Sequence, residues 1–155
     1  MPDKKEDAKV VEKKPDAKKV KTLSTVGKRK KAVARAHLRE GKGVVRINKK
    51  ALSTIMPELL RMKISEPFMI AGNEITGTID ITVNVIGGGI NSQTEAARQA
   101  IARGLVEWVK NKKELRQKFI TYDRSLLVYD PRRTEPHKCS RSSKGARRKR
   151  QLSKR

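Results

Sequence analysis

Two stretches early in the chain alternate apolar and polar residues with a period of two, which places the apolar side chains on one face of a β-strand. In "AVARAHLRE", alanine and leucine alternate with Arg35, His37 and Arg39. The turn-like "EGKG" follows, and "VVRIN" then alternates around Arg46. This pattern predicts a β-hairpin with one buried face and one cationic face.

A third alternating stretch, "TIDITVNVIGGG", predicts a strand that ends in three glycines, of which Gly87 and Gly88 are the first two. The next segment, "INSQTEAARQAIARGLVEWVK", has small and apolar residues at helical spacing. Ser92 and Glu95 fit an S-x-x-E capping box, with Ser92 as the N-cap. Small residues on the buried face would let this helix lie close to a sheet.

Shorter apolar segments complete the pattern. "ALSTIMPELLRMKISEPFMIAG" is close to helical spacing, and Pro57 and Pro67 are expected to divide it into short pieces, with Pro57 tolerated in a first turn. "KKELRQKFI" predicts a short helix and "RSLLVYD" a short extended segment. We therefore expect one small α/β (α+β) domain over residues 23–130, with at least three strands.

The two ends of the chain lack this periodicity. Residues 1–22 hold 8 lysines against 5 acids, and we expect a disordered charged extension. Residues 131–155 hold 11 Lys and Arg against one acid, Glu135. Because like charges at this density keep a chain extended, we expect residues 131–155 to form an extended basic tail that binds RNA.

The formal net charge of +23 favours a polyanionic partner, and nucleic acid is the commonest one. A membrane surface is disfavoured, because the basic tail has no apolar face to insert. No stretch approaches the roughly 18 apolar residues of a membrane span, and the N-terminal segment lacks the apolar core of a signal peptide. The cytoplasm is the expected compartment.

Few residues are suited to catalysis or to metal binding. The only histidines are His37 and His137, and the only cysteine is Cys139. His137 and Cys139 have no second ligand pair for zinc, and no base for a cysteine nucleophile is identifiable. We therefore expect no enzyme activity, no metal and no cofactor.

The glycine run fits neither of the usual nucleotide-binding patterns. It suits a tight strand-to-helix turn that needs positive φ angles, and equally a loop that meets an RNA phosphate. A small phosphotransferase that uses this loop is a third, weaker hypothesis. The basic strand face is continuous with "GKRKK", and no nearby acids neutralise it. A phosphate-binding surface is favoured there over an ordinary solvated face.

Four stretches together resemble a known family. "VGKRKKAVARAHLREGKGVVRINKK", "GGGINSQTEAARQAIARGL", "DPRRTEPHK" and "GARRKRQLSKR" are similar in order and spacing to the universal small-subunit ribosomal protein nine family. The segment "EPHKCSRSSKG" departs from the E-R-K-K-Y-G-like run of the bacterial form. The sequence resembles the archaeal and eukaryotic form instead, and we expect an archaeal source.

The resemblance implies a sheet of about four strands with helices on one face and a left-handed βαβ crossover. It implies a structural constituent of the small ribosomal subunit that binds rRNA of the subunit head beside neighbouring head proteins. It further implies that the C-terminal tail reaches the peptidyl-site tRNA. A general nucleic-acid compacting protein that acts on DNA is the alternative.

The resemblance assigns the tRNA contact to Arg155 and, next to it, Lys154. Basic residues of the domain and the tail, and two glycines of the loop, are predicted to bind rRNA. Those that the resemblance implies are Lys28, Arg29, Lys30, Arg35, Arg132, Arg133, Arg147, Arg148 and Arg150. The charge pattern and the glycine loop add Lys31, Arg39, Arg46, Gly87, Gly88, Lys144 and Lys149.

Overall fold

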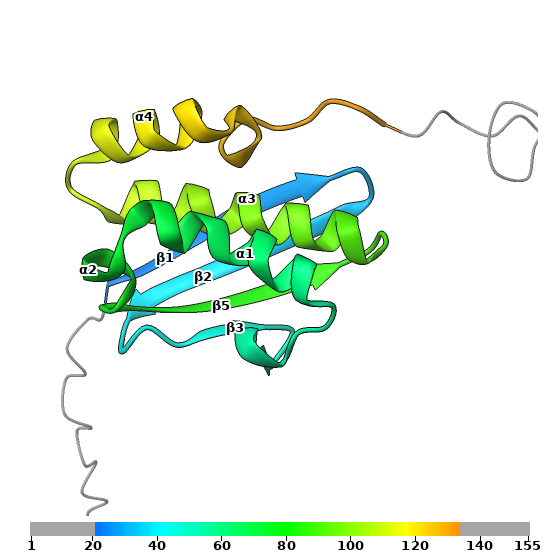
Figure 1. Cartoon of the computed structure of the whole chain (residues 1–155), viewed down its shortest axis with the longest axis horizontal. Helices are drawn as coiled ribbons and strands as arrows, with labels where there is room; N and C mark the ends of the chain where they lie inside the picture. The colour runs from blue at the N-terminus through cyan, green and yellow to red at the C-terminus, as the bar shows by residue number, and fades with distance from the viewer. Residues whose placement is uncertain (1–20, 134–155) are drawn as a thin grey trace, which may run out of the picture.

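The computed structural model describes residues 21–133, in which a sheet of five strands carries its helices on one face (Figure 1). The strand order is β1-β2-β5-β3-β4. The elements in chain order are β1 (Thr22–Arg29), β2 (Ala32–Glu40), β3 (Val45–Ile47), β4 (Lys50–Ala51), the 3₁₀ helix η1 (Leu52–Thr54), α1 (Glu58–Ala71), α2 (Asn73–Thr76), β5 (Ile79–Ile86), α3 (Ile90–Trp108), α4 (Lys112–Tyr122) and the 3₁₀ helix η2 (Arg124–Leu126).

The pairing of the strands corrects the predicted hairpin. β2 does not pair with β3, because β5 lies between them. The hairpin is instead formed by β1 and β2, which pair antiparallel over eight residues around a turn at Lys30 and Lys31. β2 and β5 both have long alternating patterns and pair from Val33↔Ile86 to Glu40↔Ile79, whereas β3 has only three residues and pairs parallel with β5. The longer ladder satisfies more backbone groups.

The predicted fold class, a small α+β domain, is confirmed. The sheet has five strands instead of about four, because the two-residue β4 extends its edge. β3 and β5 are parallel and are joined through α1, which is the βαβ unit that the resemblance implies. The predicted strand before the glycines is β5, with its alternate residues buried against the helices.

The small residues of α3 pack closely on the sheet, as the sequence predicts. Ala96, Ala97 and Ala100 are buried, and the Thr25 hydroxyl of β1 donates to the Ala100 carbonyl at 2.8 Å. The predicted capping box is wrong. The helix begins at Ile90 after Gly89, with no side-chain cap.

Pro67 does not divide the helical segment as predicted. α1 runs through it to Ala71, and Pro57 is its N-cap residue. A proline inside a helix costs a backbone hydrogen bond. Here Pro67 is fully buried, on the same face of α1 as the buried Leu60 and Ile64, and this apolar burial offsets that cost.

The predicted extended segment after α4 is also partly wrong. Its first residues form the 3₁₀ helix η2, because the Asp123 carboxylate accepts hydrogen bonds from the Ser125 backbone N–H and hydroxyl, at 2.8 and 2.7 Å. Leu126 is buried within this turn. The predicted helix over "KKELRQKFI" is confirmed as α4. η2 and the residues after it bring the chain back beside α3 and β1 (Figure 1).

Candidate nucleic-acid interface

The face of the sheet that the helices leave uncovered carries exposed cations. Lys28, Arg35, Arg39 and Arg46 alternate with the buried residues of β1, β2 and β3, so all four lie on this open face. His37 is exposed there as well, beside Thr82 of β5. The predicted cationic sheet face is therefore present, although it spans three strands and is not one hairpin.

Asp80 of β5 is the acid of this open face. Its carboxylate accepts the backbone N–H groups of Lys42 and Val44, at 2.9 and 3.0 Å, and thereby closes the loop after β2. These two hydrogen bonds lower the pKa of Asp80, and the positive charges of Arg39 and Arg46 act in the same direction. The guanidinium of Arg39 is 3.8 Å away, which is a loose pairing that leaves its donors available.

We expect stability to fall at acid pH, partly because of Asp80. A carboxylate whose pKa is lower in the folded state than its ordinary value of 3.8 stabilises the fold above that value. This contribution is lost as the pH falls through the folded pKa. Urea unfolding between pH 2 and 5 should show that the free energy of unfolding declines as the pH is lowered. This decline should be shallower in Asp80→Asn. Parallel curves for the two proteins would contradict this.

One end of the sheet collects several of the predicted site residues. Lys30 and Lys31 are exposed in the β1–β2 turn, where Lys30 has a φ of +51°. Gly87 and Gly88 follow β5 with φ of +79° and +70°, and a Cβ on Gly87 would lie 2.6 Å from the Lys31 carbonyl oxygen. The tight-turn interpretation of the glycines is therefore confirmed, and it places the glycine loop against the basic turn.

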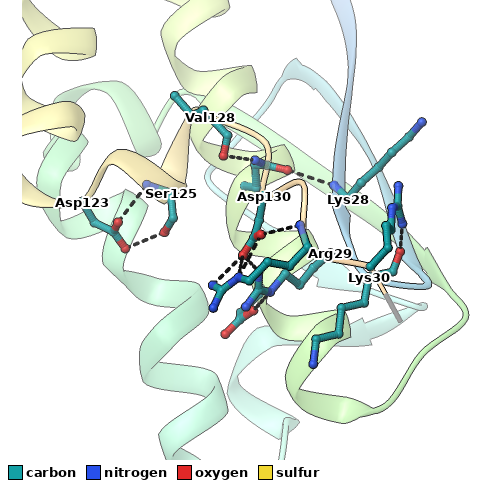
Figure 2. A network of polar contacts seen from close by, with 11 residues as sticks. Lys28, Arg29, Lys30, Asp123, Ser125, Val128 and Asp130 are labelled. Carbon is teal, nitrogen blue, oxygen red and sulfur yellow. Dashed lines mark hydrogen bonds and ion pairs between the residues drawn. The ribbon is translucent and has the colours of Figure 1, made fainter. Parts of the chain in front are cut away.

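Arg29 differs from the other predicted rRNA-binding residues because its guanidinium is already paired. Its Nε lies 2.5 Å from the Glu95 carboxylate of α3, and Nη1 pairs with the Asp130 carboxylate (Figure 2). The side chains of Arg29 and Asp130 are each 18% exposed. This cluster ties the end of β1 to α3 and to the segment that follows η2.

A second network supports the same junction. The buried Gln99 side chain of α3 accepts the Lys28 N–H and donates to the Val128 carbonyl, both at 2.9 Å. Arg98 pairs with Glu66 of α1 at 2.5 Å and with Asp123 at 3.0 Å. Burial raises the pKa of Asp123, but hydrogen bonds from Ser125 and Arg98 and the charge of Arg98 outweigh it, so the net shift is downward.

Arg132 and Arg133 leave this junction toward the C-terminal tail. The backbone N–H of Arg132 donates to Asp130 at 2.9 Å, and its guanidinium pairs with the same carboxylate, yet its side chain is 76% exposed. Arg133 donates to the Lys30 carbonyl (Figure 2). Its guanidinium also lies over the Tyr129 ring. The structure thus joins the start of the tail to the basic turn.

Two further searches of the described residues concern metal binding and membrane insertion. Among residues 21–133, no group of three His, Cys, Asp or Glu side chains could hold a metal ion. Nor does that part of the chain contain a helix both long and apolar enough to cross a membrane.

A family model described as "Ribosomal protein S9/S16" matches residues 27–155. The chain belongs to this ribosomal protein family. The match begins within β1 and continues through the glycine loop, the junction and the whole tail. It supports the resemblance that the sequence motifs carried.

Individual relatives agree with the family assignment. The chain is 52% identical over 134 residues to the "Small ribosomal subunit protein uS9" of Methanococcus maripaludis, covering 86% of this chain and 98% of the relative. The protein of the same name from Methanococcus vannielii is 52% identical over the same length, with the same coverage. Both relatives are archaeal, as the predicted archaeal type requires.

Family membership confirms several predictions at once. The chain is a ribosomal protein of the archaeal S9 type and a structural constituent, not an enzyme. Its place is accordingly the ribosome. The individual site residues are a separate matter, because the family match names no contacts.

The predicted residues of the tail lie outside the residues that the structure describes. These are Lys144, Arg147, Arg148, Lys149, Arg150, Lys154 and Arg155. Among the predicted site residues that the structure does describe, five lie together at one end of the sheet: Lys30, Lys31, Gly87, Gly88 and Arg133. Arg39 lies toward the opposite end of β2, and Arg46 lies on β3.

Sequence reasoning missed two arginines of α3. Arg98 and Arg103 occur in a helix with ordinary spacing, and their contacts are with residues far away along the chain. Arg103 donates from Nη1 to the Val26 carbonyl of β1 at 2.9 Å. No local pattern signals a contact of this kind, since it depends on how α3 lies across the sheet.

Proposed function

We propose that this ribosomal protein binds the rRNA of the small-subunit head through its open sheet face and the basic end of the sheet. The observation that carries the proposal is the set of exposed cations, Lys28, Arg35, Arg39 and Arg46, on the one sheet face without helices. Phosphate contacts of this kind position a protein on RNA, while the RNA fold supplies specificity. Lys30, Lys31, Gly87, Gly88, Arg132 and Arg133 extend this surface to the start of the tail.

The tail is the second part of the proposal. Residues 131–155 would follow rRNA phosphates, and Lys154 and Arg155 would contact the peptidyl-site tRNA. The family match supports this because it extends to residue 155, so the basic end is part of the shared sequence. Arginine-rich chains bind phosphates bidentately without base-specific contacts.

Neighbouring proteins of the subunit head are the remaining proposed partners. The outer side of α1 exposes Leu59, Met62 and Met69. Apolar side chains gathered on one helix are typical of protein contacts, whereas RNA presents phosphates and riboses. The cationic sheet face and this apolar helix face lie on different sides of the domain, so RNA and protein partners can bind together.

The proposal is tested by sedimentation of tagged protein from its native cells through a high-salt sucrose gradient. Stoichiometric comigration with the small subunit is expected. Purified protein should bind rRNA with an affinity that falls steeply with salt, at a log–log slope of about −0.7 to −0.9 for each phosphate contacted. A general compacting protein would instead leave the particles on washing and bind any DNA duplex with similar affinity.

Removal of Ser153, Lys154 and Arg155 should leave incorporation into the subunit intact while weakening peptidyl-site tRNA binding by at least about tenfold. Two positive side chains are lost, and a charge-assisted phosphate contact contributes roughly 1.5 to 3 kcal/mol. Binding of tRNA to purified subunits measures the effect. A matched deletion of residues 1–20, which precede the family match, should change neither property. Failure of the shortened protein to enter subunits would refute this division of roles.

A further inference from the structure

A cation-lined pocket lies at the outer edge of β1. It is lined by Val26, Lys28, Arg103, Tyr129 and Arg133, and its volume is about 470 Å³. The three cations come from a strand, from α3 and from the segment after η2. The residues that line the pocket include no acid. A volume of this size lies within the range of small-ligand sites, roughly 300 to 1,000 Å³.

Two of the three cations are held in place by backbone carbonyls of β1 and of the turn that follows it. Arg103 donates to the Val26 carbonyl at 2.9 Å, and Arg133 donates to the Lys30 carbonyl. The Lys28 N–H is bound by Gln99 at 2.9 Å. Since a guanidinium has five N–H donors, each arginine keeps donors for a ligand after its backbone contact is made. The two guanidinium groups are therefore positioned before any ligand arrives, whereas Gln99 fixes only the backbone of Lys28.

These cations differ from the arginines that hold the fold together. Arg29, Arg98 and Arg132 each pair with one or two carboxylates. Within residues 21–133, no ion pair joins Lys28, Arg103 or Arg133 to an acid. Like charges around one hollow repel each other, and an anion in that hollow relieves the repulsion. The pocket is thus suited to an anionic group.

We propose that this pocket binds a backbone phosphate of the rRNA, with Arg103 as a ligand that extends the interface from the sheet onto α3. The inference rests on the proposed rRNA-binding function and adds a specific contact to it. The volume is many times the roughly 30 Å³ of one water, so a phosphate fits together with its flanking ribose. Lys28 belongs both to the pocket and to the open sheet face, which makes the two surfaces continuous.

The experiment compares Arg103→Gln with Arg124→Gln in the full-length chain. Glutamine removes the charge and keeps an amide donor for the Val26 carbonyl. Arg124 is exposed on η2 and does not line the pocket, so its substitution is a matched loss of one charge. Binding to an rRNA fragment of the subunit head is measured between 50 and 300 mM KCl, about the range over which phosphate contacts dominate.

We expect Arg103→Gln to weaken binding about tenfold and to reduce the log–log salt slope by about 0.7 to 0.9, the amount due to one phosphate. Arg124→Gln should leave the slope unchanged. The rRNA affinity of Arg103→Lys should lie between that of Arg103→Gln and that of the wild type, because lysine keeps the charge but lacks the planar guanidinium. If Arg103→Gln fails to fold, as judged by circular dichroism, Arg133→Gln provides the same comparison.

The other outcomes separate this inference from the proposed function. Equal behaviour of the Arg103 and Arg124 variants, with salt-dependent binding by the wild type, overturns the pocket assignment alone. A wild type without salt-dependent rRNA affinity overturns the proposed function and the pocket assignment with it. Titration with inorganic phosphate, followed by NMR at the arginine Nε groups, tests for a small free anion. Saturation of the Arg103 signal at micromolar phosphate would replace rRNA by a free anion as the ligand.

Discussion

Replacement of Gly27 by alanine is expected to lower the free energy of unfolding by about 3 kcal/mol or more. A Cβ at this position would lie 2.6 Å from the Ala100 backbone nitrogen and closer still to the Ala96 carbonyl oxygen. Both atoms belong to the backbone of α3, so neither can rotate away. β1 cannot move away freely, since it pairs with β2 over eight residues. The added methyl group must therefore separate α3 from the sheet.

Two other glycines provide controls for this effect. A Cβ on Gly104 would meet the ends of two side chains, Leu38 Cδ1 at 2.6 Å and Thr25 Oγ1 at 3.1 Å, which can shift. Alanine also favours a helix by about 1 kcal/mol over glycine, so Gly104→Ala should cost under about 1.5 kcal/mol. Gly89 has no atom within 4 Å of an added Cβ. Urea unfolding of the three Gly→Ala variants measures their free energies of unfolding. Similar losses of stability in Gly27→Ala and Gly89→Ala would contradict the close packing of β1 and α3.

The close packing of α3 also shows which parts of the fold are predictable from sequence. β5 and α3 are long, strongly periodic segments, and their periods of 2 and 3.6 identify them and their buried faces. β1 lacks that signal because Thr25 and Gly27 occupy its buried positions. Contact with α3 requires small residues at these positions, and no local pattern reveals that contact. The missed strand explains the wrong hairpin, since β2 was left without its true partner.

The residues of the candidate interface also include some that local sequence predicts and some that it does not. Alternation with buried residues places Arg35, Arg39 and Arg46 on an exposed face, and the structure confirms that placement. Whether an arginine is free or paired depends on carboxylates that are distant in the sequence. Glu95 fits a capping box locally, but the structure uses it to hold Arg29. Local chemistry therefore predicted the exposed cations well and the paired ones poorly.

Arg29→Gln is the other substitution with a large expected effect, a loss of about 2 to 3 kcal/mol in the free energy of unfolding. Without the guanidinium, the Glu95 and Asp130 carboxylates face each other partly buried and without their shared cation. The cost is below that of a fully buried pair, because Asp130 keeps Arg132 at 2.7 Å. Arg61→Gln removes an exposed pair with Glu58 on α1 and should cost under about 1 kcal/mol.

A double substitution of Arg29 and Glu95 shows how much of the lost stability comes from leaving the Glu95 carboxylate without its cation. Glu95→Gln should remove the repulsion that Arg29→Gln creates, so the double variant should be more stable than Arg29→Gln alone. Hydrogen exchange provides a local measurement. The Arg132 backbone N–H donates to Asp130, and it should exchange faster in Arg29→Gln once Asp130 is no longer held. Unchanged exchange at Arg132, together with wild-type stability, would show that the cluster does not tether this segment.

The same variant decides how Arg29 serves rRNA binding. If Arg29 were only a direct phosphate ligand, its loss would reduce the salt slope by the 0.7 to 0.9 of one contact and leave stability unchanged. The structure favours a tether instead, because the guanidinium is mostly buried between two carboxylates while Arg132 is exposed beside it. Release of Asp130 would free Arg132, which pairs with it, and would loosen the segment that carries Arg133 to the basic turn. We therefore expect a slope reduced by about two contacts together with the loss of stability, a combination that a simple ligand cannot produce.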